Sequence, residues 1–385
     1  MLAPVQPRKG SRIVVAMSGG VDSSVAAGWL KQQGYDVIGI SLQLHDQAQS
    51  TENKFGTCCS ISDIQDARTV AEKMGIPFYV ANMEDQFEEA VIDNFVGEYL
   101  QGRTPNPCVK CNEKVKFSRL MDWAMDLGAD YLATGHYAQI YSDPETGKHE
   151  LARAVDPQKD QSYFLFTMRP EDLPRTIFPV GGLEKAQVRE LASQLGLMHV
   201  AQKPDSQEIC FVQAKSYREF IEERVPASQL KPGRLLDPHG VVLGQHTGLH
   251  QFTIGQRKGL GVFSPDPLYV LEIRPETGDV VVGPESCLFR KSAVVAGMHW
   301  IRPFDPSAKL TAKIRYRASD SPVEVSLLGG DRIEVRFLQP QRAITPGQAL
   351  VLYDGQTVLG GGWIESLSLD LPPERAIPAQ ASLGA

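Results

Sequence analysis

Apolar runs and helical patterns alternate along the first half of the chain. Short β-branched or apolar runs at residues 13–15, 36–44 and 77–81 predict buried strands. Between and after them, apolar side chains at helical spacing predict helices at residues 23–33 and from about residue 85 to 100. This alternation predicts an α/β fold with a doubly wound parallel sheet, whose ligand lies beyond the carboxyl ends of the strands.

The second half of the chain has a different pattern. From Gly233 onward it is rich in Gly and Pro with short strands, and alternating strands at 310–317, 323–328, 332–337 and 349–354 predict a small antiparallel barrel. A chain of 385 residues exceeds what one core usually serves. We therefore predict a catalytic domain at 11–214, a central β-rich domain at 215–289, a carboxyl-terminal β-barrel at 290–368 and a disordered tail at 369–385.

Composition narrows the setting. The chain is 42% hydrophobic and 22% charged, as in soluble globular proteins, and has no run of about 18 apolar residues, so we expect a cytoplasmic protein without a membrane partner. The net charge of −7 argues against a generally basic nucleic-acid binder, although local fields decide such binding. Six cysteines without a secretory signal favour thiol or metal chemistry over a disulfide scaffold.

The first strand runs directly into Ser-Gly-Gly-Val-Asp-Ser at residues 18–23, followed by a helical pattern. Adjacent glycines let a ligand approach the backbone, and a helix amino terminus attracts anions, so this turn predicts a phosphate site. It is neither a Walker loop nor the GxGxxG dinucleotide motif. For a bare SGG, an ordinary strand-to-helix turn would be the simpler interpretation.

Two cysteines occupy a stretch, residues 102–117, that is rich in positive charge. Pro105 and Pro107 predict a constrained loop carrying Cys108 and Cys111 ahead of a helix that begins near Glu113. The positive charge comes from Arg103, Lys110, Lys114, Lys116 and Arg119. Such a local excess lowers the pKa of a thiol and attracts phosphate. The alternative is a structural zinc knuckle completed by Cys58 and Cys59, but adjacent cysteines are an awkward pair for one tetrahedral metal.

Three further features carry candidate chemistry. Cys210 lies in an apolar run typical of a core cysteine, yet the charged residues just before it are hard to place in a core. His136 follows a short strand, where it is either structural or beside the nucleotide. Period two would place Lys313, Arg315 and Arg317 on one face suited to a phosphate backbone, unless they protect an exposed edge strand.

Taken together, SGGVDSS, GRTPNPCVKCNEKVKF, ATGHYA, KDQSYFL and PDSQEICF resemble the motifs of the bacterial tRNA-specific 2-thiouridylase family, within the ATP pyrophosphatase superfamily. RYRA at 315–318 and TPGQ at 345–348 are similar to that family's carboxyl-terminal domain. The resemblance implies an enzyme that uses ATP and Mg²⁺ to thiolate carbon 2 of the wobble uridine, position 34 of tRNA. It implies release of AMP and pyrophosphate.

The resemblance also implies roles for individual residues. Cys111 would be the catalytic nucleophile, and Cys210 would carry a persulfide received from an upstream sulfur-relay protein or cysteine desulfurase. ATP would contact Ala16, Met17, Ser18, Gly19, Gly20, Val21, Asp22, Ser23, Leu42 and Gly135. The tRNA anticodon arm would contact Asn106, Pro107, Cys108, His136, Lys159, Asp160, Gln161, Arg315, Tyr316 and Gln348. We expect a monomer.

Cys108 departs from part of this family, in which many members carry an Asp proposed as an acid/base group. Cys108, Cys111 and Cys210 could instead be three ligands of a [4Fe–4S] centre that binds sulfide, so persulfide and cluster routes both stay open. Two other functions compete. An ATP pyrophosphatase that adenylates a small metabolite needs no cysteines or basic barrel, and a zinc-stabilised RNA-binding module would not need SGGVDS.

Overall fold

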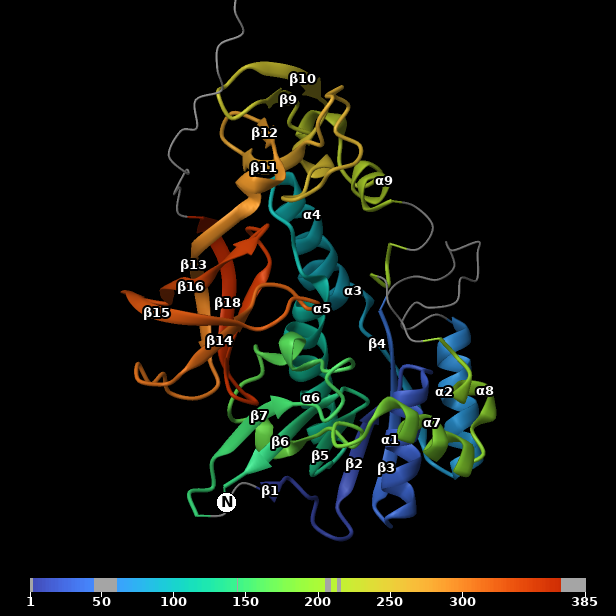
Figure 1. Ribbon diagram of the computed structural model, residues 1–385. Helices are drawn as coiled ribbons and strands as arrows, with labels where there is room; N and C mark the ends of the chain where they lie inside the picture. Colours follow the sequence, from blue (N-terminus) through green and yellow to red (C-terminus); the bar gives the residue numbers. More distant parts are fainter. Residues whose placement is uncertain (1–2, 45–60, 144, 205–208, 213–215, 368–385) are drawn as a thin grey trace, which may run out of the picture.

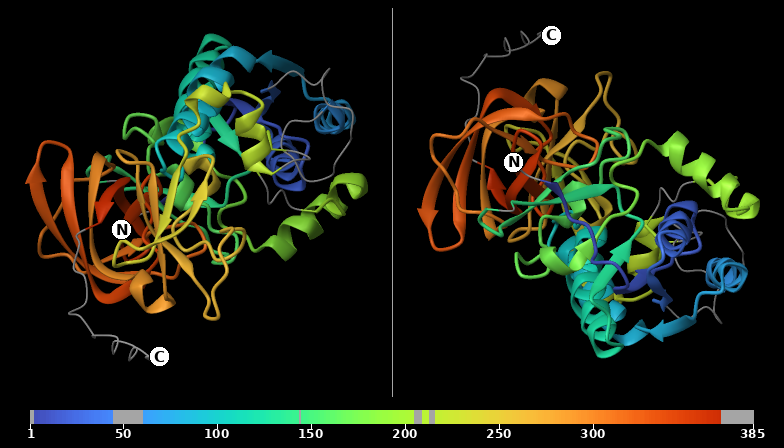
Figure 2. Two further views of the ribbon diagram at one scale, coloured as in Figure 1. Left: turned by 90° about the horizontal axis from the view of Figure 1, so that it is seen from above. Right: turned by 90° about the horizontal axis from the view of Figure 1, so that it is seen from below.

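The computed structural model describes residues 3–44, 61–143, 145–204, 209–212 and 216–367. Three parts are visible in Figure 1: a domain with a parallel sheet, a β-rich domain at the far end of α4, and a barrel beside them. The barrel and the parallel-sheet domain lie on opposite sides of the molecule in both views of Figure 2. Cys58, Cys59 and the predicted tail at 369–385 fall outside the described residues.

The amino-terminal domain is built on a five-stranded parallel sheet, which confirms the predicted fold class. Val14 points into one apolar cluster and its neighbours Ile13 and Val15 into another, as expected for a strand covered on both faces. The strand order is β4 (Phe78–Asn82), β3 (Asp36–Gln43), β2 (Arg12–Ala16), β5 (Tyr131–Thr134) and β8 (Thr176–Ile177).

Helices cover both faces of this sheet. On the Ile13 face pack α1 (Val21–Gln32), α2 (Ile61–Met74), α7 (Lys185–Gln194) and α8 (Met198–Ala201). The other face is covered by a continuous helix made of α3 (Glu84–Phe87), a π-helical stretch (Glu88–Ile92) and α4 (Asp93–Leu100). This helix buries Phe87, Val91, Phe95 and Tyr99, the apolar positions of the predicted helix at 85–100.

The cysteine pair lies in a helix, and the predicted loop up to Glu113 is wrong. α5 (Pro107–Lys110) continues into a π-helical stretch (Cys111–Arg119) and then α6 (Leu120–Asp126). Pro107 is the first helical residue, where proline's missing N–H costs nothing and its φ suits a helix. Asn106 caps this end, because its side chain accepts a hydrogen bond from the Val109 N–H at 3.3 Å.

The central domain has a four-stranded sheet in the order β10 (Val242–His246), β9 (Gly233–Leu236), β12 (Asp279–Gly283) and β11 (Tyr269–Arg274). It is preceded by α9 (Tyr217–Glu222). The two histidines of the HTGLH stretch have separate partners: His246 bonds to the Gly278 carbonyl at 2.9 Å and His250 to Glu222 at 2.8 Å.

The carboxyl-terminal strands form a closed six-stranded barrel, because β18 pairs with both β13 and β17. The strands are β13 (Phe289–Trp300), β14 (Leu310–Lys313), β15 (Ser321–Gly329), β16 (Arg332–Arg342), β17 (Ala349–Asp354) and β18 (Thr357–Leu367). β14 ends at Lys313, so the strand predicted to reach residue 317 is too long. Arg315 and Arg317 lie on bends and turns, where the period-two argument for a shared face does not apply.

The barrel sheet extends into the parallel-sheet domain. β6 (Ala138–Ser142) and β7 (His149–Arg153) form a hairpin that leaves the end of β5, and β7 pairs with β18 through Ala152 and Thr357. β1 (Ala3–Pro4) adds to β6 at the outer edge. Within the described residues, no helix is long and apolar enough to cross a membrane.

Candidate functional site

The turn at residues 18–23 lies at the carboxyl end of β2 and leads into α1. Gly19 has φ +74°, and a Cβ there would lie 2.1 Å from the Asp63 carbonyl oxygen, so only glycine fits. Gly20 is the amino-terminal cap of α1. The Ser18 N–H donates to the Ser23 hydroxyl oxygen at 3.1 Å. A compact turn that ends in a helix amino terminus is suited to bind an anion.

Asp22, the acidic residue of this loop, has two partners far away in the sequence. The Lys185 ammonium lies 2.7 and 2.9 Å from its carboxylate oxygens, and the Tyr137 hydroxyl donates to it at 2.8 Å. Lys185 begins α7, and its side chain is 11% exposed. Sequence reasoning missed Lys185, because no spacing connects it with a loop 163 residues earlier.

A second lysine reaches the loop from beyond α8. The Lys203 ammonium pairs with Asp63 at 2.9 Å and with Asp66, and it lies 3.4 Å from the Gly19 carbonyl oxygen. Burial would lower the pKa of Lys203, but the hydrogen bonds to Asp66 and Asp63 outweigh it and raise the pKa. Two positive side chains therefore stand at a loop whose own sequence has none.

The end of β5 packs directly against this loop. A Cβ on Gly135 would lie 2.5 Å from the Ser23 backbone nitrogen, so glycine allows the close contact. The His136 ring lies beside Phe117 and Phe178, and its Nδ1 is 2.8 Å from the Thr134 hydroxyl. Burial, helped by the charge of Lys116, holds the pKa of His136 well below its usual value, so the imidazole is neutral at pH 7.

The residues expected to bind ATP lie together at the carboxyl ends of neighbouring strands. Met17 continues β2 and donates its N–H to the Ile40 carbonyl at 2.8 Å. Leu42 lies near the end of β3, next to Ala81 of β4, and is buried. Gly135 follows the end of β5, the strand on the other side of β2. The three strand ends form the edge where a doubly wound sheet binds its ligand.

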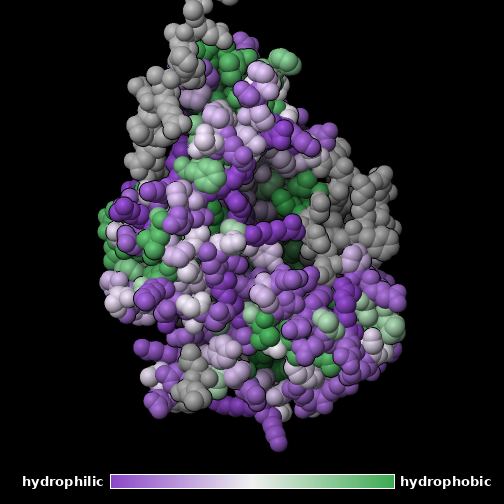
Figure 3. Space-filling model, in the orientation of Figure 1, coloured by the Kyte–Doolittle hydropathy of each residue, from purple (hydrophilic) through white to green (hydrophobic). Residues whose placement is uncertain are grey.

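The cysteines differ in exposure. Cys108 is exposed in the first turn of α5, and Cys111, one turn later, is 9% exposed. Cys111 belongs to the large apolar cluster on the Val14 face of the sheet, and half-buried Cys210 packs against the same cluster. Figure 3 shows a hollow with an apolar floor on the face between the central domain and the parallel-sheet domain. Among the residues that the structure describes, no three His, Cys, Asp or Glu side chains are grouped to hold a metal ion.

The barrel contacts the segment that leads into the cysteine helix. The Thr104 N–H donates to the Pro346 carbonyl at 2.9 Å. The Gln348 side-chain amide donates to the Thr104 and Pro105 carbonyls at 3.0 and 3.1 Å. The TPGQ turn therefore joins the barrel to the cysteine segment. Gln348 is directed at protein carbonyls here, although the family resemblance implies a contact with tRNA.

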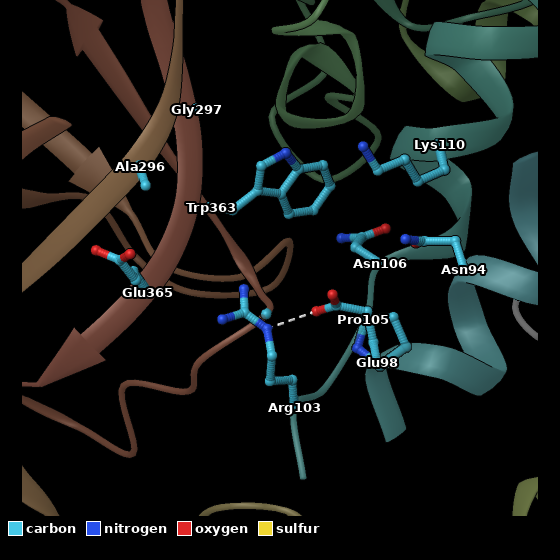
Figure 4. A pocket seen from close by; sticks show the side chains of 11 residues that line it. Asn94, Glu98, Arg103, Pro105, Asn106, Lys110, Ala296, Gly297, Trp363 and Glu365 are labelled. Atoms are coloured by element: carbon cyan, nitrogen blue, oxygen red, sulfur yellow. Dashed lines mark hydrogen bonds and ion pairs between the residues drawn. The ribbon is translucent and has the colours of Figure 1, made fainter. Parts of the chain in front are cut away.

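A pocket of about 260 Å³ lies beside this junction, between α4, the lead-in to α5, and strands β13 and β18 (Figure 4). Arg103 pairs with Glu98 at 2.7 Å on its wall, and the Lys110 ammonium lies 4.6 Å from the centre of the Trp363 ring. Asn94 and Asn106 add amide groups. An indole, two cations and two amides can contact both the base and the phosphate of a nucleotide.

The other residues expected at the tRNA differ in their placement. Arg315 is exposed and Lys159 half-buried, whereas the half-buried Tyr316 ring packs 4.5 Å from that of Phe164. Asp160 is 4% exposed, and its oxygens accept hydrogen bonds from the Ala154 and Ser162 N–H groups and the Ser162 hydroxyl. Gln161 bonds to Tyr137 through both its backbone and its side chain. Asp160 and Gln161 thus order the segment internally.

Comparison with known proteins agrees with this architecture. Three family models match: a tRNA methyl transferase HUP domain at residues 11–214, a tRNA methyl transferase PRC-barrel domain at 218–284, and an aminomethyltransferase beta-barrel domain at 290–364. Relatives named tRNA-specific 2-thiouridylase MnmA include one from Geotalea uraniireducens (strain Rf4), 52% identical over 94% of this chain and 96% of its own, and one from Heliobacterium modesticaldum (strain ATCC 51547 / Ice1), 49% identical over 94% and 95%.

Among solved structures, U34-tRNA thiolase NcsA from Methanococcus maripaludis is 19% identical over 58% of this chain and 70% of its own, with a TM-score of 0.33, a similarity too weak to argue from. The relatives at about half identity, by contrast, match this chain from the catalytic domain through the barrel. The chain therefore belongs to the tRNA-specific 2-thiouridylase family.

Proposed function

We propose that this enzyme catalyses the ATP-dependent 2-thiolation of the wobble uridine of tRNA, at the anticodon arm. The supporting observation is that one domain holds both halves of the chemistry. Its strand ends carry a phosphate loop with two added lysines, and its apolar cluster contains Cys111 with Cys210 packed against it. The family names of its relatives point to the same reaction.

The first step would convert a poor leaving group into a good one. The uracil C2 oxygen attacks the α-phosphate of ATP bound at residues 16–23, Leu42 and Gly135, and pyrophosphate leaves. Lys185, Lys203 and the amino terminus of α1 would offset the charge that develops on the phosphates. Mg²⁺ supplied with ATP neutralises phosphate charge, and Asp22 is the loop carboxylate that could hold it.

The second step would deliver sulfur. Cys210, loaded with a sulfane sulfur by an upstream relay protein or desulfurase, attacks C2 through its terminal persulfide sulfur, and AMP leaves. The Cys111 thiolate then attacks the inner sulfur of Cys210, which releases the thiolated uridine and leaves a Cys111–Cys210 disulfide for an external dithiol to reduce. Cys108, exposed at the start of the same helix, would act as the acid/base group.

A [4Fe–4S] centre on Cys108, Cys111 and Cys210 is the competing way to hold sulfur. It would require Cys108, Cys111 and Cys210 to converge, whereas the persulfide route needs only Cys111 and Cys210 to meet. We therefore route no step through a cluster. Anaerobic purification followed by iron and acid-labile sulfide assays tests this choice: a colourless protein that stays active after chelation agrees with it, and stoichiometric iron needed for activity overturns it.

The tRNA would approach from the side of the barrel. Residues 106–108 at the start of the cysteine helix would meet the target base, which must leave its stack to be reached. Arg315 and Lys159 would contact the backbone, with Tyr316 and neutral His136 next to the anticodon loop. The nearby pocket adds the Trp363 ring to this face, with its two cations paired to Glu98 and Glu113.

Mass spectrometry of tRNA nucleosides after incubation with ATP and a sulfur source tests the proposal. We expect Cys210→Ser to lower 2-thiouridine formation by at least about a hundredfold, as loss of a covalent carrier should. Its affinity for tRNA should stay within about twofold, because phosphate contacts dominate binding. Cys287→Ser, a half-buried cysteine before the barrel, is the matched control and should retain activity.

Two results would contradict the proposal. One is thiolation that persists in the Cys210→Ser protein. The other is pyrophosphate release from ATP that does not depend on tRNA, which would favour a small-metabolite substrate instead.

A further inference from the structure

We infer that Tyr137 is a positioning residue for the activation of ATP, and that it acts through the Asp22 carboxylate of the turn at residues 18–23. The inference deepens the proposed function and rests on it for the role of ATP at this turn. The ATGHYA motif pointed to Gly135 and His136, and the structure adds the tyrosine that follows them.

Tyr137 contacts both members of the Asp22–Lys185 ion pair. Its hydroxyl donates to Asp22 Oδ1 at 2.8 Å, the same oxygen that the Lys185 ammonium reaches at 2.7 Å. The Lys185 ammonium also lies 5.6 Å from the centre of the Tyr137 ring, within the range of a cation–π contact. One side chain therefore constrains the position of both charges.

The two donors to Asp22 differ in rigidity. A lysine reaches its partner through a flexible four-carbon chain and acts as a point charge. A tyrosine has only two side-chain torsions, and the Tyr137 side chain is 2% exposed within the apolar cluster on the Ile13 face of the sheet. The fixed hydroxyl on Oδ1 therefore sets the direction of the carboxylate, which the lysine alone would leave adjustable.

The segment at residues 156–161 supports both of these donors. The Tyr137 N–H donates to the Gln161 side-chain oxygen at 2.9 Å, and the Gln161 N–H donates to the Tyr137 carbonyl at 2.7 Å. At the other end of the segment, the Asp156 carboxylate accepts a hydrogen bond from the Lys185 N–H at 3.1 Å. The same short stretch of chain thus holds both residues that contact Asp22.

The turn itself is pressed against the strand end that leads to Tyr137. Gly135 packs on the Ser23 backbone nitrogen without room for a Cβ, so the tyrosine follows the turn closely. Misplacement of a reacting or binding group by about 1 Å costs on the order of 100-fold in rate. Loss of the Tyr137 hydroxyl should therefore appear in the binding and use of ATP.

The test measures the Kd for ATP by equilibrium dialysis, with the full-length protein in Mg²⁺ buffer and without tRNA. Tyr137→Phe removes the hydroxyl and keeps the ring. Tyr35→Phe is the matched control, because the Tyr35 hydroxyl donates to the Pro7 carbonyl at 3.2 Å in the same domain, beyond the far end of α1.

We expect the Kd for ATP to rise roughly tenfold in Tyr137→Phe, because a hydrogen bond to a charged group contributes about that factor. The KM for ATP in tRNA-dependent pyrophosphate release should rise by a similar factor. The Kd for tRNA and the urea midpoint should match those of Tyr35→Phe, which should bind ATP as the wild type does.

A second comparison shows whether Tyr137 acts through Asp22. In a protein that already carries Asp22→Ala, adding Tyr137→Phe should leave the Kd for ATP unchanged, because the acceptor of the hydroxyl is gone. A merely structural role of the tyrosine would instead weaken ATP binding by the same factor in both backgrounds.

The inference is overturned if Tyr137→Phe binds ATP as the wild type does, or if its effect persists in the Asp22→Ala background. Should Tyr137→Phe fail to fold, Gln161→Met, which removes the acceptor of the Tyr137 N–H, decides by the same two comparisons. ATP binding without tRNA does not require thiolation, so the inference can fail or stand separately from the proposed reaction.

Discussion

At the scale of single residues, the proposed phosphate site depends on side chains from distant parts of the chain. The loop motif supplies backbone N–H groups and hydroxyls but no positive side chain. Lys185 provides that charge. Its ammonium donates hydrogen bonds to both carboxylate oxygens of Asp22, and its side chain is largely buried. A phosphate bound at this turn, as we propose, would offer the ammonium an oxygen partner in addition to the carboxylate.

Replacing Lys185 by Met keeps much of the side-chain length and removes the charge. We expect the KM for ATP to rise roughly tenfold, since a charge-assisted hydrogen bond contributes about 1.5–3 kcal/mol. The assay is tRNA-dependent pyrophosphate release at varied ATP.

Lys31→Met, an exposed lysine in the last turn of α1, is the control. A KM unchanged by Lys185→Met would show that the lysine serves only to hold Asp22.

At the scale of elements, local pattern predicted β2, β3, β4, α1 and the helix that ends at Leu100, but β8, α7 and α8 were not predicted. Buried β-branched runs and helical spacing depend only on residues that are close in the sequence, so they can be recognised without knowing the tertiary structure. The prediction of a loop at the cysteine segment was wrong for a physical reason. Proline excludes a helix where a backbone N–H must donate, but the first helical position, where Pro107 lies, needs no N–H. The strand predicted at 310–317 was too long, because the chain turns after Lys313.

The central sheet offers an element-level prediction about pH. Arg234 on β9 donates two hydrogen bonds, both 2.9 Å, to Asp279 on the adjacent β12, and this bonding lowers the pKa of Asp279 to about 2 from 3.8. A carboxyl with a lowered pKa stabilises the fold above its unfolded value and loses that contribution as pH falls. The stabilisation should therefore be complete above about pH 4 and disappear towards about pH 2.

This pH dependence is tested by measuring the free energy of unfolding in urea at several pH values, for the wild type and for Asp279→Asn. We expect the variant to be about 1 kcal/mol less stable at pH 7, a modest figure because Arg234 is half exposed to solvent. The difference should shrink below pH 4.

Asp266→Asn, an exposed position in the same domain, should show no such difference. A deficit that persists unchanged at pH 2.5 would argue against the ion pair as its cause.

At the scale of the whole molecule, the contacts between domains were not predictable from the sequence. Residues 138–142 and 149–153 have the alternation of a hairpin, but nothing local indicates that β7 extends the barrel sheet through Thr357 of β18. The same holds for the bond between the TPGQ turn and the cysteine segment. Such pairings join positions more than 200 residues apart. The catalytic domain and the barrel are consequently expected to behave as one unit.

Arg153, at the end of β7, tests this unity. Its guanidinium lies 3.6 Å from the centre of the Tyr353 ring of the barrel and bonds to Asp320 at 2.8 Å, with buried Asp160 at 3.6 Å. Replacing it by Met leaves the buried Asp160 without its counter-ion, and breaking such a pair costs about 3 kcal/mol. We expect a lower urea midpoint and a separation of the barrel transition from that of the parallel-sheet domain.

Arg8→Met, an exposed arginine before β2, should unfold as the wild type does. If Arg153→Met unfolds in one transition at the wild-type midpoint, the contacts of Arg153 do not couple the two domains.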